Sequence, residues 1–495
     1  MYLKSILLYS NNEEILKYGI LDTLYITKND IIDLYLLKNL INLKELHILY
    51  NHKNILNYIP NNITILHISN LNIINFNFLS KLNYLSELNI FNNKNSNISD
   101  IFLPKSLTYL NCASCDIENY SFISKLNNLK TLIISNNISI DNDFDNNIPE
   151  NVETLIMEFM YLKNYKFIER LENLKRLNIS FNHIKNNLHL INLTSNLQYL
   201  DDYGTYIENY NFLKKLPNLI EYRFDLDKNI NISNVNLSSQ YNLTYLDLYS
   251  CVLNVDLLLG HTKLKKIKLN FRSCSNDIII DLPVCLENIK IINNHNINNY
   301  NFIKELINLK KMKIVNSCIN NLYMHKNLET IKFENCNSNY AFSFKYFNKL
   351  YKLTTLKLGI INPFINDCIL PNNIQKIIIG DMSMLKNIKY IESIKNLQCI
   401  EINNIYFNTH IKNDNIINLN NTNIKYFKLI NCPNVKFIIY LPDTIEIIEY
   451  IHKLFDISLW KYYTNLKKII ILKCIKDRVM DIYKNKNVEI CFFEK

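Results

Sequence analysis

Two cysteines three residues apart, Cys112 and Cys115, are the first side chains whose spacing could support chemistry. A C-x-x-C pair is typical of zinc sites and of redox-active disulfides. A tetrahedral zinc site needs two further ligands, and the sequence holds no second C-x-x-C pair to supply them. The ten histidines are scattered, five glycines are too few for a phosphate-binding loop, and no G-x-S-x-G or H-E-x-x-H motif occurs. We therefore expect a protein that is not an enzyme and holds no metal or cofactor.

A second group of residues could bind a partner through aromatic and charged contacts. Three segments place Tyr, Arg and acidic residues at alternate positions, which share one face of a strand. The group is Tyr199, Asp201, Tyr203, Glu221, Arg223, Asp225, Tyr245, Asp247 and Tyr249. Tyr and Arg are enriched among the residues that dominate binding energy at protein interfaces. The alternative is an ordinary surface, because this chain has 33 tyrosines.

A third group is a row of lysines at one equivalent position of five successive segments. The row is Lys268, Lys290, Lys313, Lys332 and Lys357, flanked by Lys266, Lys311 and Lys376. Glu334 is the one obvious acid nearby in the pattern. Like charges side by side on a sheet repel one another, so the row favours an acidic protein surface or a nucleic-acid backbone as partner. The alternative is a solvated face in a chain that uses Lys far more than Arg.

The elements that must position these residues repeat along the whole chain. The pattern L-x-x-L-x-I registers with itself at steps of 19 to 27 residues. Its second apolar position falls at Leu24, Leu46, Leu66, Leu88, Leu110, Leu132, Leu155, Leu177, Leu200, Tyr222, Leu246, Ile267, Ile289, Met312, Ile331, Leu356, Ile377, Ile400, Phe427, Ile448 and Ile469. One unit cannot bury its own apolar side, so neighbouring units must stack and pair their strands in a parallel sheet. Within L-x-I the apolar residues face the core and the residue between them faces outward.

Individual units resemble known repeat families. Residues 164–184, NYKFIERLENLKRLNISFNHI, resemble the short leucine-rich repeat of internalin-type proteins. Ile59–Ile68 and Leu282–Ile291 resemble the L-P-x-x-L repeats of bacterial effectors and the FNIP-type repeats of slime moulds and large DNA viruses. The composition, rich in residues with A/T-rich codons, is similar to that of insect poxvirus repeat proteins. The resemblance implies an α/β leucine-rich-repeat solenoid, a curved horseshoe of about 21 to 22 coils with a parallel sheet on its concave face and short helices and extended segments on its convex face.

Two kinds of unit alternate along the repeat. One kind carries an aromatic or apolar residue in the pattern F-[IL]-x-x-L, at Phe78, Phe122, Phe167, Phe212, Leu257, Phe302, Tyr346 and Tyr390. The other kind carries a proline, at Pro60, Pro104, Pro149, Pro283 and Pro371. We expect the first kind to return through a short helix and the second through an extended segment, because proline fixes φ and removes a backbone donor. The neighbouring Tyr120, Tyr165, Tyr210 and Tyr300 should pack in the core rather than hold a ligand.

Polar residues also recur at one inward position, five residues after the register position. It holds Asn29, Asn51, Asn93, Asn137, Asn182 and Asn294 in some units and Cys115, Cys251, Cys336, Cys432 and Cys474 in others. We expect these side chains to satisfy backbone groups where each strand ends, which explains Cys115 without a metal. Asp202 occupies an inward position where Leu or Ile is expected, so either the strand bulges there or Asp202 has a partner.

The chain shows no sign of a domain boundary. No Gly-, Ser- or Pro-rich linker occurs, so we expect one solenoid over residues 1–495. Residues 1–20 would form the N-terminal cap and first coil, 21–474 the repeats and 475–495 the C-terminal cap, with short strands at Ile6–Leu8 and Val488–Ile490. The rhythm slips once, in a step of 27 residues after Ile400.

The bulk properties fit a folded binding protein. Hydrophobic residues make up 48% of the chain, the formal net charge is +10, and no apolar run is long enough for a membrane span or a signal peptide. We expect a cytoplasmic protein, in the host cell if viral. The expected function is a scaffold for protein–protein interaction through the concave face, centred on residues 199–357. The alternatives are nucleic-acid or polyanion binding along the lysine row, and a substrate-receptor subunit of a ubiquitin ligase, for which we find no adaptor motif. The oligomeric state stays open.

Overall fold

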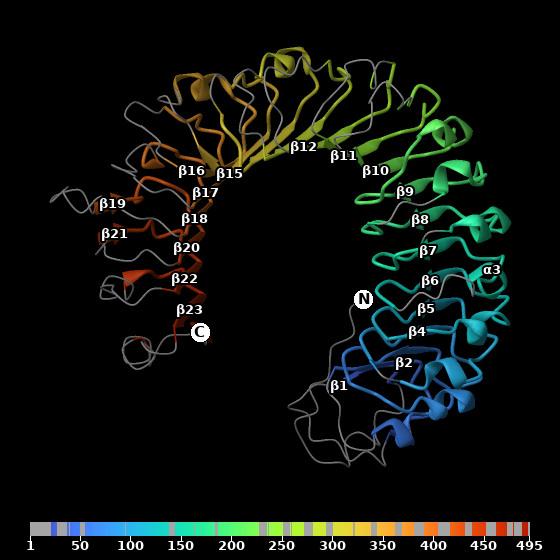
Figure 1. Cartoon of the computed structure of the whole chain (residues 1–495). Coiled ribbons are helices and arrows are strands. Elements are labelled where there is room, and N and C mark those ends of the chain that lie inside the picture. Colours follow the sequence, from blue (N-terminus) through green and yellow to red (C-terminus); the bar gives the residue numbers. More distant parts are fainter. Residues whose placement is uncertain are drawn as a thin grey trace. The chain divides into compact units, whose positions relative to one another are not determined.

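The apolar repeat forms short strands that pair in parallel with the strand of the next coil. The computed structural model describes residues 21–26, 37–38, 40–49, 55–94, 96–137, 144–162, 164–183, 187–226, 235, 237–250, 258, 260–271, 281–293, 300–319, 322–337, 344–361, 369–380, 391–403, 416–430, 438–451, 462–472, 479 and 488–493. The chain divides into two units, unit 1 with Met1–Leu243 and unit 2 with Thr244–Lys495. Within each unit the strands line the inner side of the curve, and the short helical turns lie on its outer side (Figure 1). The continuity of one solenoid across both units stays a prediction.

The strands of both units carry the predicted repeat. Unit 1 contains β1 (Thr23–Ile26), β2 (Glu45–Ile48), β3 (Ile65–His67), β4 (Glu87–Asn89), β5 (Tyr109–Asn111), β6 (Thr131–Ile133), β7 (Thr154–Ile156), β8 (Arg176–Asn178), β9 (Tyr199–Asp201) and β10 (Glu221–Leu226). Unit 2 contains β11 (Tyr245–Ser250), β12 (Lys266–Phe271), β13 (Asn288–Ile292), β14 (Lys311–Val315), β15 (Thr330–Asn337), β16 (Thr355–Ile361), β17 (Lys376–Gly380), β18 (Cys399–Asn403), β19 (Ile416–Asn418), β20 (Tyr426–Ile430), β21 (Ile438–Tyr440), β22 (Ile447–Ile451), β23 (Lys468–Leu472) and β24 (Glu489–Phe493).

The predicted register is confirmed strand by strand within each unit. In unit 1 the register residues pair in sequence order from Leu24 to Tyr222. In unit 2 they pair from Leu246 to Ile469 and on to Ile490. Burial alternates along strands such as β13, in which Ile289 and Ile291 are buried and the three residues between and beside them are half-buried. This alternation follows from the period of two in a strand and places the outward positions where the sequence predicted.

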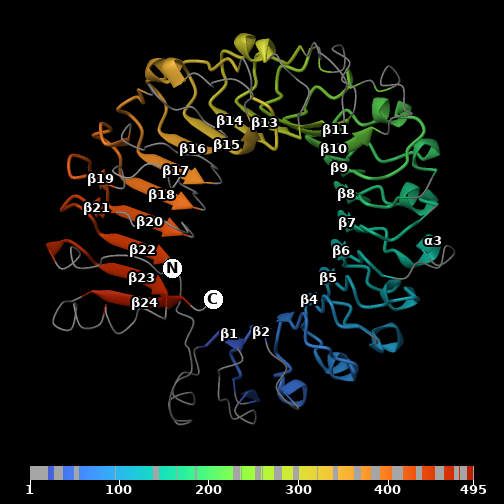
Figure 2. The ribbon, with the colours of Figure 1, turned by 60° about the vertical axis from the view of Figure 1, so that its left-hand side comes forward.

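One feature at the C-terminal side differs from the predicted plan. The 27-residue step after Ile400 contains β19, which pairs in parallel with β21 and not with the strands of the main repeat. Figure 2 shows β19 and β21 apart from the neighbouring β18, β20 and β22. The closing strand expected at Val488–Ile490 is confirmed by β24, which pairs in parallel with β23. The predicted strand Ile6–Leu8 and the N-terminal cap lie outside the described residues.

The returns from strand to strand contain short helical turns in both kinds of unit. The 3-10 helices are η1 (Ile55–Tyr58), η2 (Asn77–Lys81), η3 (Ile98–Asp100), η4 (Ser121–Ile123), η5 (Lys166–Arg170), η6 (Leu188–Leu190), η7 (Asn211–Lys215), η10 (Asn301–Glu305) and η11 (Phe344–Lys349), and α3 spans Phe144–Asn147. Turns η2, η4, η5, η7, η10 and η11 carry the predicted Phe pattern. A purely extended return is wrong for the proline units, because η1, η3 and α3 precede Pro60, Pro104 and Pro149. Turns η1 and η3 each direct an isoleucine into the core.

The tyrosines beside the Phe pattern pack in the core, as predicted. Tyr120, Tyr165, Tyr210 and Tyr300 are each at most 1% exposed. Each stands at the residue before its 3-10 helix begins. Burying such a large ring at each return fills the space between the sheet and the outer turns. No helix among the described residues has the length and apolar character needed to cross a membrane.

Asparagine at the position where the strands end ties adjacent coils together. Asn93 is fully buried, and its Oδ1 accepts hydrogen bonds from the backbone N–H groups of Leu71 and Ile73 at 3.2 and 2.9 Å. Its Nδ2 donates to the carbonyls of Ile68 and Ile90 at 2.9 and 2.7 Å. Asn137 and Asn182 repeat this pattern in later coils. The side chain thus satisfies backbone groups that the sheet leaves unpaired, which confirms the predicted role.

Candidate functional site

The predicted lysine row forms one column on the outward face of unit 2. Strands β12 to β16 align Lys268, Lys290, Lys313, Lys332 and Lys357 as direct register partners, and we call these five residues the lysine column. Neighbouring strands in a sheet lie about 4.8 Å apart, so the column would run for roughly 19 Å. Lys266 and Lys311 lie on the same strands two residues earlier, and both are exposed. The sequence therefore placed these cations together correctly.

Acidic side chains neutralise part of the lysine column. The Lys268 ammonium lies 2.8 Å from the Asp247 carboxylate, and Glu334 bridges Lys313 and Lys357 at 2.6 and 2.7 Å. Burial acts to raise the pKa of Glu334, but the hydrogen bonds from both lysines outweigh it and the pKa is lowered. A similar logic operates elsewhere in unit 2, where Lys428 meets Glu449 at 2.8 Å and Lys376 meets Glu401 at 2.5 Å. The outward face thus pairs its lysines wherever the next strand offers an acid.

Two members of the column are left without such a partner. Within the described residues, neither Lys290 nor Lys332 has a carboxylate within ion-pair distance. The pKa of Lys290 is lowered, first by burial and then by the repulsion of Lys268 and Lys313 on either side. An ammonium in this position is destabilised by its own surroundings. An anion placed beside Lys290 would relieve that repulsion.

The aromatic and charged group predicted on unit 1 is less accessible than the sequence implied. Tyr199 is 7% exposed, because its ring lies between the guanidinium groups of Arg176 and Arg223, at 4.0 and 5.7 Å from the ring centroid. Asp201 is 5% exposed and accepts hydrogen bonds from the Tyr199 hydroxyl and the Tyr203 backbone N–H. These two residues form an internal cluster of the sheet face and not a free contact surface.

The rest of that group lies on both units. Glu221, Arg223 and Asp225 are half-buried on β10 of unit 1, and Arg223 lies 3.7 Å from the Asp201 carboxylate. On β11 of unit 2, Tyr245 and Tyr249 are half-buried, whereas Asp247 is only 8% exposed. Asp247 is buried because Lys268 covers it. A single binding surface made from all three strands stays a prediction.

Asp202 resolves the choice that the sequence left open. Its side chain is fully buried, and Oδ2 accepts a hydrogen bond from the Tyr222 hydroxyl at 3.0 Å. Burial raises the pKa of Asp202 well above its ordinary range, against the lowering effect of that hydrogen bond. Strand β9 ends at Asp201, and Gly204 follows with φ of +66°. Asp202 therefore has a partner, and a buried carboxyl group replaces the expected aliphatic side chain.

The two cysteines of the C-x-x-C pair pack in the core. Cys112 and Cys115 are both buried free thiols. The Cys115 thiol donates to the Ile90 carbonyl at 3.2 Å, which is the work that Asn93 and Asn137 do in neighbouring coils. Burial raises the pKa of Cys115 to about 11. Among the described residues, no cluster of three or more His, Cys, Asp or Glu side chains could hold a metal ion.

Two rows of aromatic side chains on unit 1 were not predicted. Tyr25 stacks on His47 with ring centroids 4.2 Å apart, and His67 meets His47 edge-on at 4.5 Å. Farther along, Phe159 stacks on Phe181, and Tyr203 closes that row. The repeat frame contains the signal for the second row, since Phe stands where neighbouring coils have Asn or Ser, four residues after the register position.

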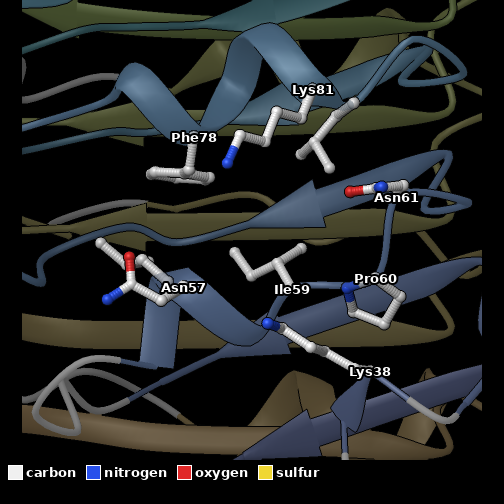
Figure 3. A pocket seen from close by; sticks show the side chains of 9 residues that line it. Lys38, Asn57, Ile59, Pro60, Asn61, Phe78 and Lys81 are labelled. Carbon is white, nitrogen blue, oxygen red and sulfur yellow. The ribbon is translucent and has the colours of Figure 1, made fainter.

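A hollow of about 420 Å³ lies between the returns of unit 1. It is lined by Lys38, Leu56, Asn57, Ile59, Pro60, Asn61, Phe78, Lys81 and Leu82. Figure 3 shows Phe78 and Lys81 on one side of it and Lys38 on the other. Both lysines are exposed, and the Lys38 ammonium lies 5.0 Å from the centre of the Tyr58 ring. This hollow is an open space between η1 and η2, and we assign no ligand to it.

Comparison with known proteins agrees with the geometry of the coils. No family model matches the chain. A leucine-rich repeat-containing protein of Amsacta moorei entomopoxvirus is 52% identical over 274 residues, which are 55% of this chain and 55% of that protein. The chain thus spans about half the length of this curated relative.

Two solved structures are also similar. An internalin of Listeria monocytogenes is 14% identical, and the similarity covers 79% of this chain and 88% of that one with a TM-score of 0.36. CroV588, a circular leucine-rich-repeat protein, is 16% identical, with coverage of 97% and 64% and a TM-score of 0.49. The in-register parallel coils and the buried asparagine position give this chain the leucine-rich-repeat fold, and the chain is similar to the entomopoxvirus leucine-rich-repeat protein over 55% of its length.

Proposed function

We propose that this chain is a non-catalytic scaffold that binds an acidic segment of a partner protein on the lysine column. The observation that carries the proposal is the pair of unneutralised ammonium groups, Lys290 and Lys332, in a column whose other three lysines have acidic partners. They lie on β13 and β15, two strands apart, or roughly 10 Å. Carboxylates of a partner would lie beside Lys290 and Lys332, as Asp247 and Glu334 lie beside the other three lysines of the column.

A protein partner fits this surface better than nucleic acid does. The acids Asp247 and Glu334 lie within the column itself and would repel a continuous phosphate backbone. A protein segment can present its carboxylates at intervals and avoid those two positions. The chain also has only five arginines, the residue that most often makes bidentate phosphate contacts. The entomopoxvirus relative makes an infected insect cell the appropriate source in which to seek the partner.

The test is affinity purification from such cells with quantitative mass spectrometry. Lys290→Glu combined with Lys332→Glu reverses the two unneutralised charges. Lys326→Glu combined with Lys352→Glu is the matched control, because both residues are exposed in the turns before β15 and β16 and the net charge changes equally. We expect the first double variant to lose acidic partners that the wild type and the control retain.

The same partners recovered with all three proteins would refute the proposal. Recovery of nucleic acid, with binding that falls steeply as salt rises, would instead assign the column to polyanion binding. Circular dichroism of both double variants checks that the coils remain folded, as we expect for substitutions at half-exposed and exposed positions.

A further inference from the structure

Four residues after the register position, two successive coils of unit 1 hold phenylalanine, Phe159 and Phe181. In ten of the described coils this position is left-handed, with φ between 47° and 66°, and holds Asn70, Asn92, Ser114, Asn136, Phe159, Phe181 and Gly204 in unit 1 and Asn293, Asn316 and Asn335 in unit 2. Asn, Ser and Gly accept positive φ at little cost, whereas a bulky side chain there is a rare and strained arrangement. Phe159 and Phe181 are therefore held in a conformation that disfavours them.

The Phe159 and Phe181 side chains cannot form a hydrogen bond that would offset this backbone strain. At other coils the polar side chain links neighbours, as when Asn92 donates to Asn70 at 2.8 Å and Asn136 donates to Ser114 at 3.0 Å. The two phenylalanines stack instead, with ring centroids 4.6 Å apart and planes 1° from parallel. Tyr203 meets Phe181 edge-on at 5.2 Å. We call Phe159, Phe181 and Tyr203 the aromatic stack.

The aromatic stack faces solvent. The Phe159 side chain is 37% exposed, and Phe181 and Tyr203 are half-buried. Asparagine would serve these coils with less strain and without exposing apolar rings. Strained backbone conformations cluster at functional sites, and exposed apolar patches mark interaction surfaces.

The Glu158 carboxylate links the two coils that carry Phe159 and Phe181. Glu158 precedes Phe159, and its Oε1 accepts hydrogen bonds from Asn178 at 2.6 Å and from the buried Ser180, which precedes Phe181, at 3.3 Å. These two donors hold the carboxylate on the coils that carry Phe159 and Phe181. Its Oε2 accepts no hydrogen bond from any residue that the structure describes, and Glu158 has no ion-pair partner there.

We propose that Glu158 and the aromatic stack form a docking site for an arginine-bearing segment of a partner protein. A guanidinium group stacks on aromatic faces and donates several hydrogen bonds to a carboxylate, so it matches both features at once. The free Oε2 supplies the acceptor, and the phenylalanine rings supply the flat surface. The site lies on unit 1 and does not depend on the lysine column of unit 2.

The test uses the full chain and a fluorescent peptide in which two arginines are spaced by glycine and serine. Its uncharged match carries citrulline in place of each arginine. Phe159→Asn with Phe181→Asn restores the residue that other coils use, so this double variant should fold at least as well as the wild type. Glu158→Gln keeps an acceptor for Asn178 and removes the charge. Phe102→Asn is the control, because Phe102 is an 80% exposed phenylalanine of the same unit.

We expect fluorescence anisotropy to show arginine-peptide binding to the wild type and to the Phe102→Asn control. The dissociation constant should rise about fivefold or more in the double variant and about threefold or more in Glu158→Gln, with the citrulline peptide bound weakly throughout. Concentration-dependent self-association that the double variant abolishes would instead assign the aromatic stack to contacts between copies of this chain and would overturn the proposed partner. Equal binding by the wild type and the folded double variant, or no binding by the wild type, would overturn the proposal.

Discussion

Replacing Asp202 with asparagine tests whether a neutral acid is buried in unit 1. Within the described residues the Asp202 carboxyl group accepts one hydrogen bond, from the Tyr222 hydroxyl to Oδ2, and its other oxygen, Oδ1, is buried without a partner. Burial is the main reason that its pKa is raised, and the nearby Asp201 and Asp225 act in the same direction. Asparagine has nearly the same shape, can still accept from Tyr222 and cannot ionise.

The sign of the pH effect follows from the direction of the shift. A carboxyl whose pKa is raised on folding binds its proton more tightly in the folded state, so stability falls as pH rises above the ordinary value of about 3.9. The fall continues until the pKa of the folded state is reached, with a slope of up to about 1.4 kcal/mol per pH unit. Asp202→Asn removes this slope. We therefore expect the variant to gain stability over the wild type with every step in pH through this window.

Urea unfolding followed by circular dichroism at several pH values between 4 and 8 measures the difference. Hydrogen exchange of peptides from β9 and β10 shows whether the change is local, since coils of a repeat protein interact mainly with their neighbours. Asp100→Asn, an exposed acid of the same unit, is the control and should give no pH-dependent difference. A constant difference between Asp202→Asn and the wild type across the pH range would refute the buried neutral acid.

Two further predictions concern buried polar groups. Asn182→Ala leaves the backbone groups of Met157, Met160 and Ile179 without their partner. The free energy of unfolding of unit 1, measured with denaturant, should therefore fall by about 3 kcal/mol or more. A fall below about 1 kcal/mol would contradict the role assigned to the buried asparagines. Tyr165→Phe should be neutral or slightly stabilising, since the buried Tyr165 hydroxyl has no hydrogen-bond partner among the described residues, whereas Tyr300→Phe should cost about 1 kcal/mol through loss of the bond to the Cys318 carbonyl. Thermal unfolding of both variants compares the two, and equal effects would contradict the difference in hydrogen bonding.

The register of the strands could be predicted because one physical requirement fixes it. Each coil must contribute its apolar side to a common core, and a slip of one residue would turn Leu132 or Leu155 to the outside. The same requirement aligned the lysine column without any structural information. The position of Asn93 and Cys115 was equally readable, because a strand end leaves backbone groups that need a polar partner.

The partners of polar residues could not be read in the same way. Asp202 was visible as an anomaly, but its bond to Tyr222 joins two positions that the repeat assigns to aliphatic residues. No rule of the repeat couples an acid in one coil with a tyrosine in the next. Strands β19 and β21 were missed for a related reason, since they lie outside the L-x-I frame and pair only with each other among the described residues.

The frame also predicts direction without predicting accessibility. Tyr199, Asp201 and Asp247 stand at or beside outward positions, and yet all three are buried. Outward side chains in adjacent strands lie only about 5 Å apart, so a long neighbour can cover a short one. Arg176 and Arg223 cover Tyr199, and Lys268 covers Asp247. Exposure on such a sheet is thus decided by the lengths and charges of three adjacent residues. Lys290 has no acid beside it among the described residues, because its register neighbours Lys268 and Lys313 pair with Asp247 and Glu334.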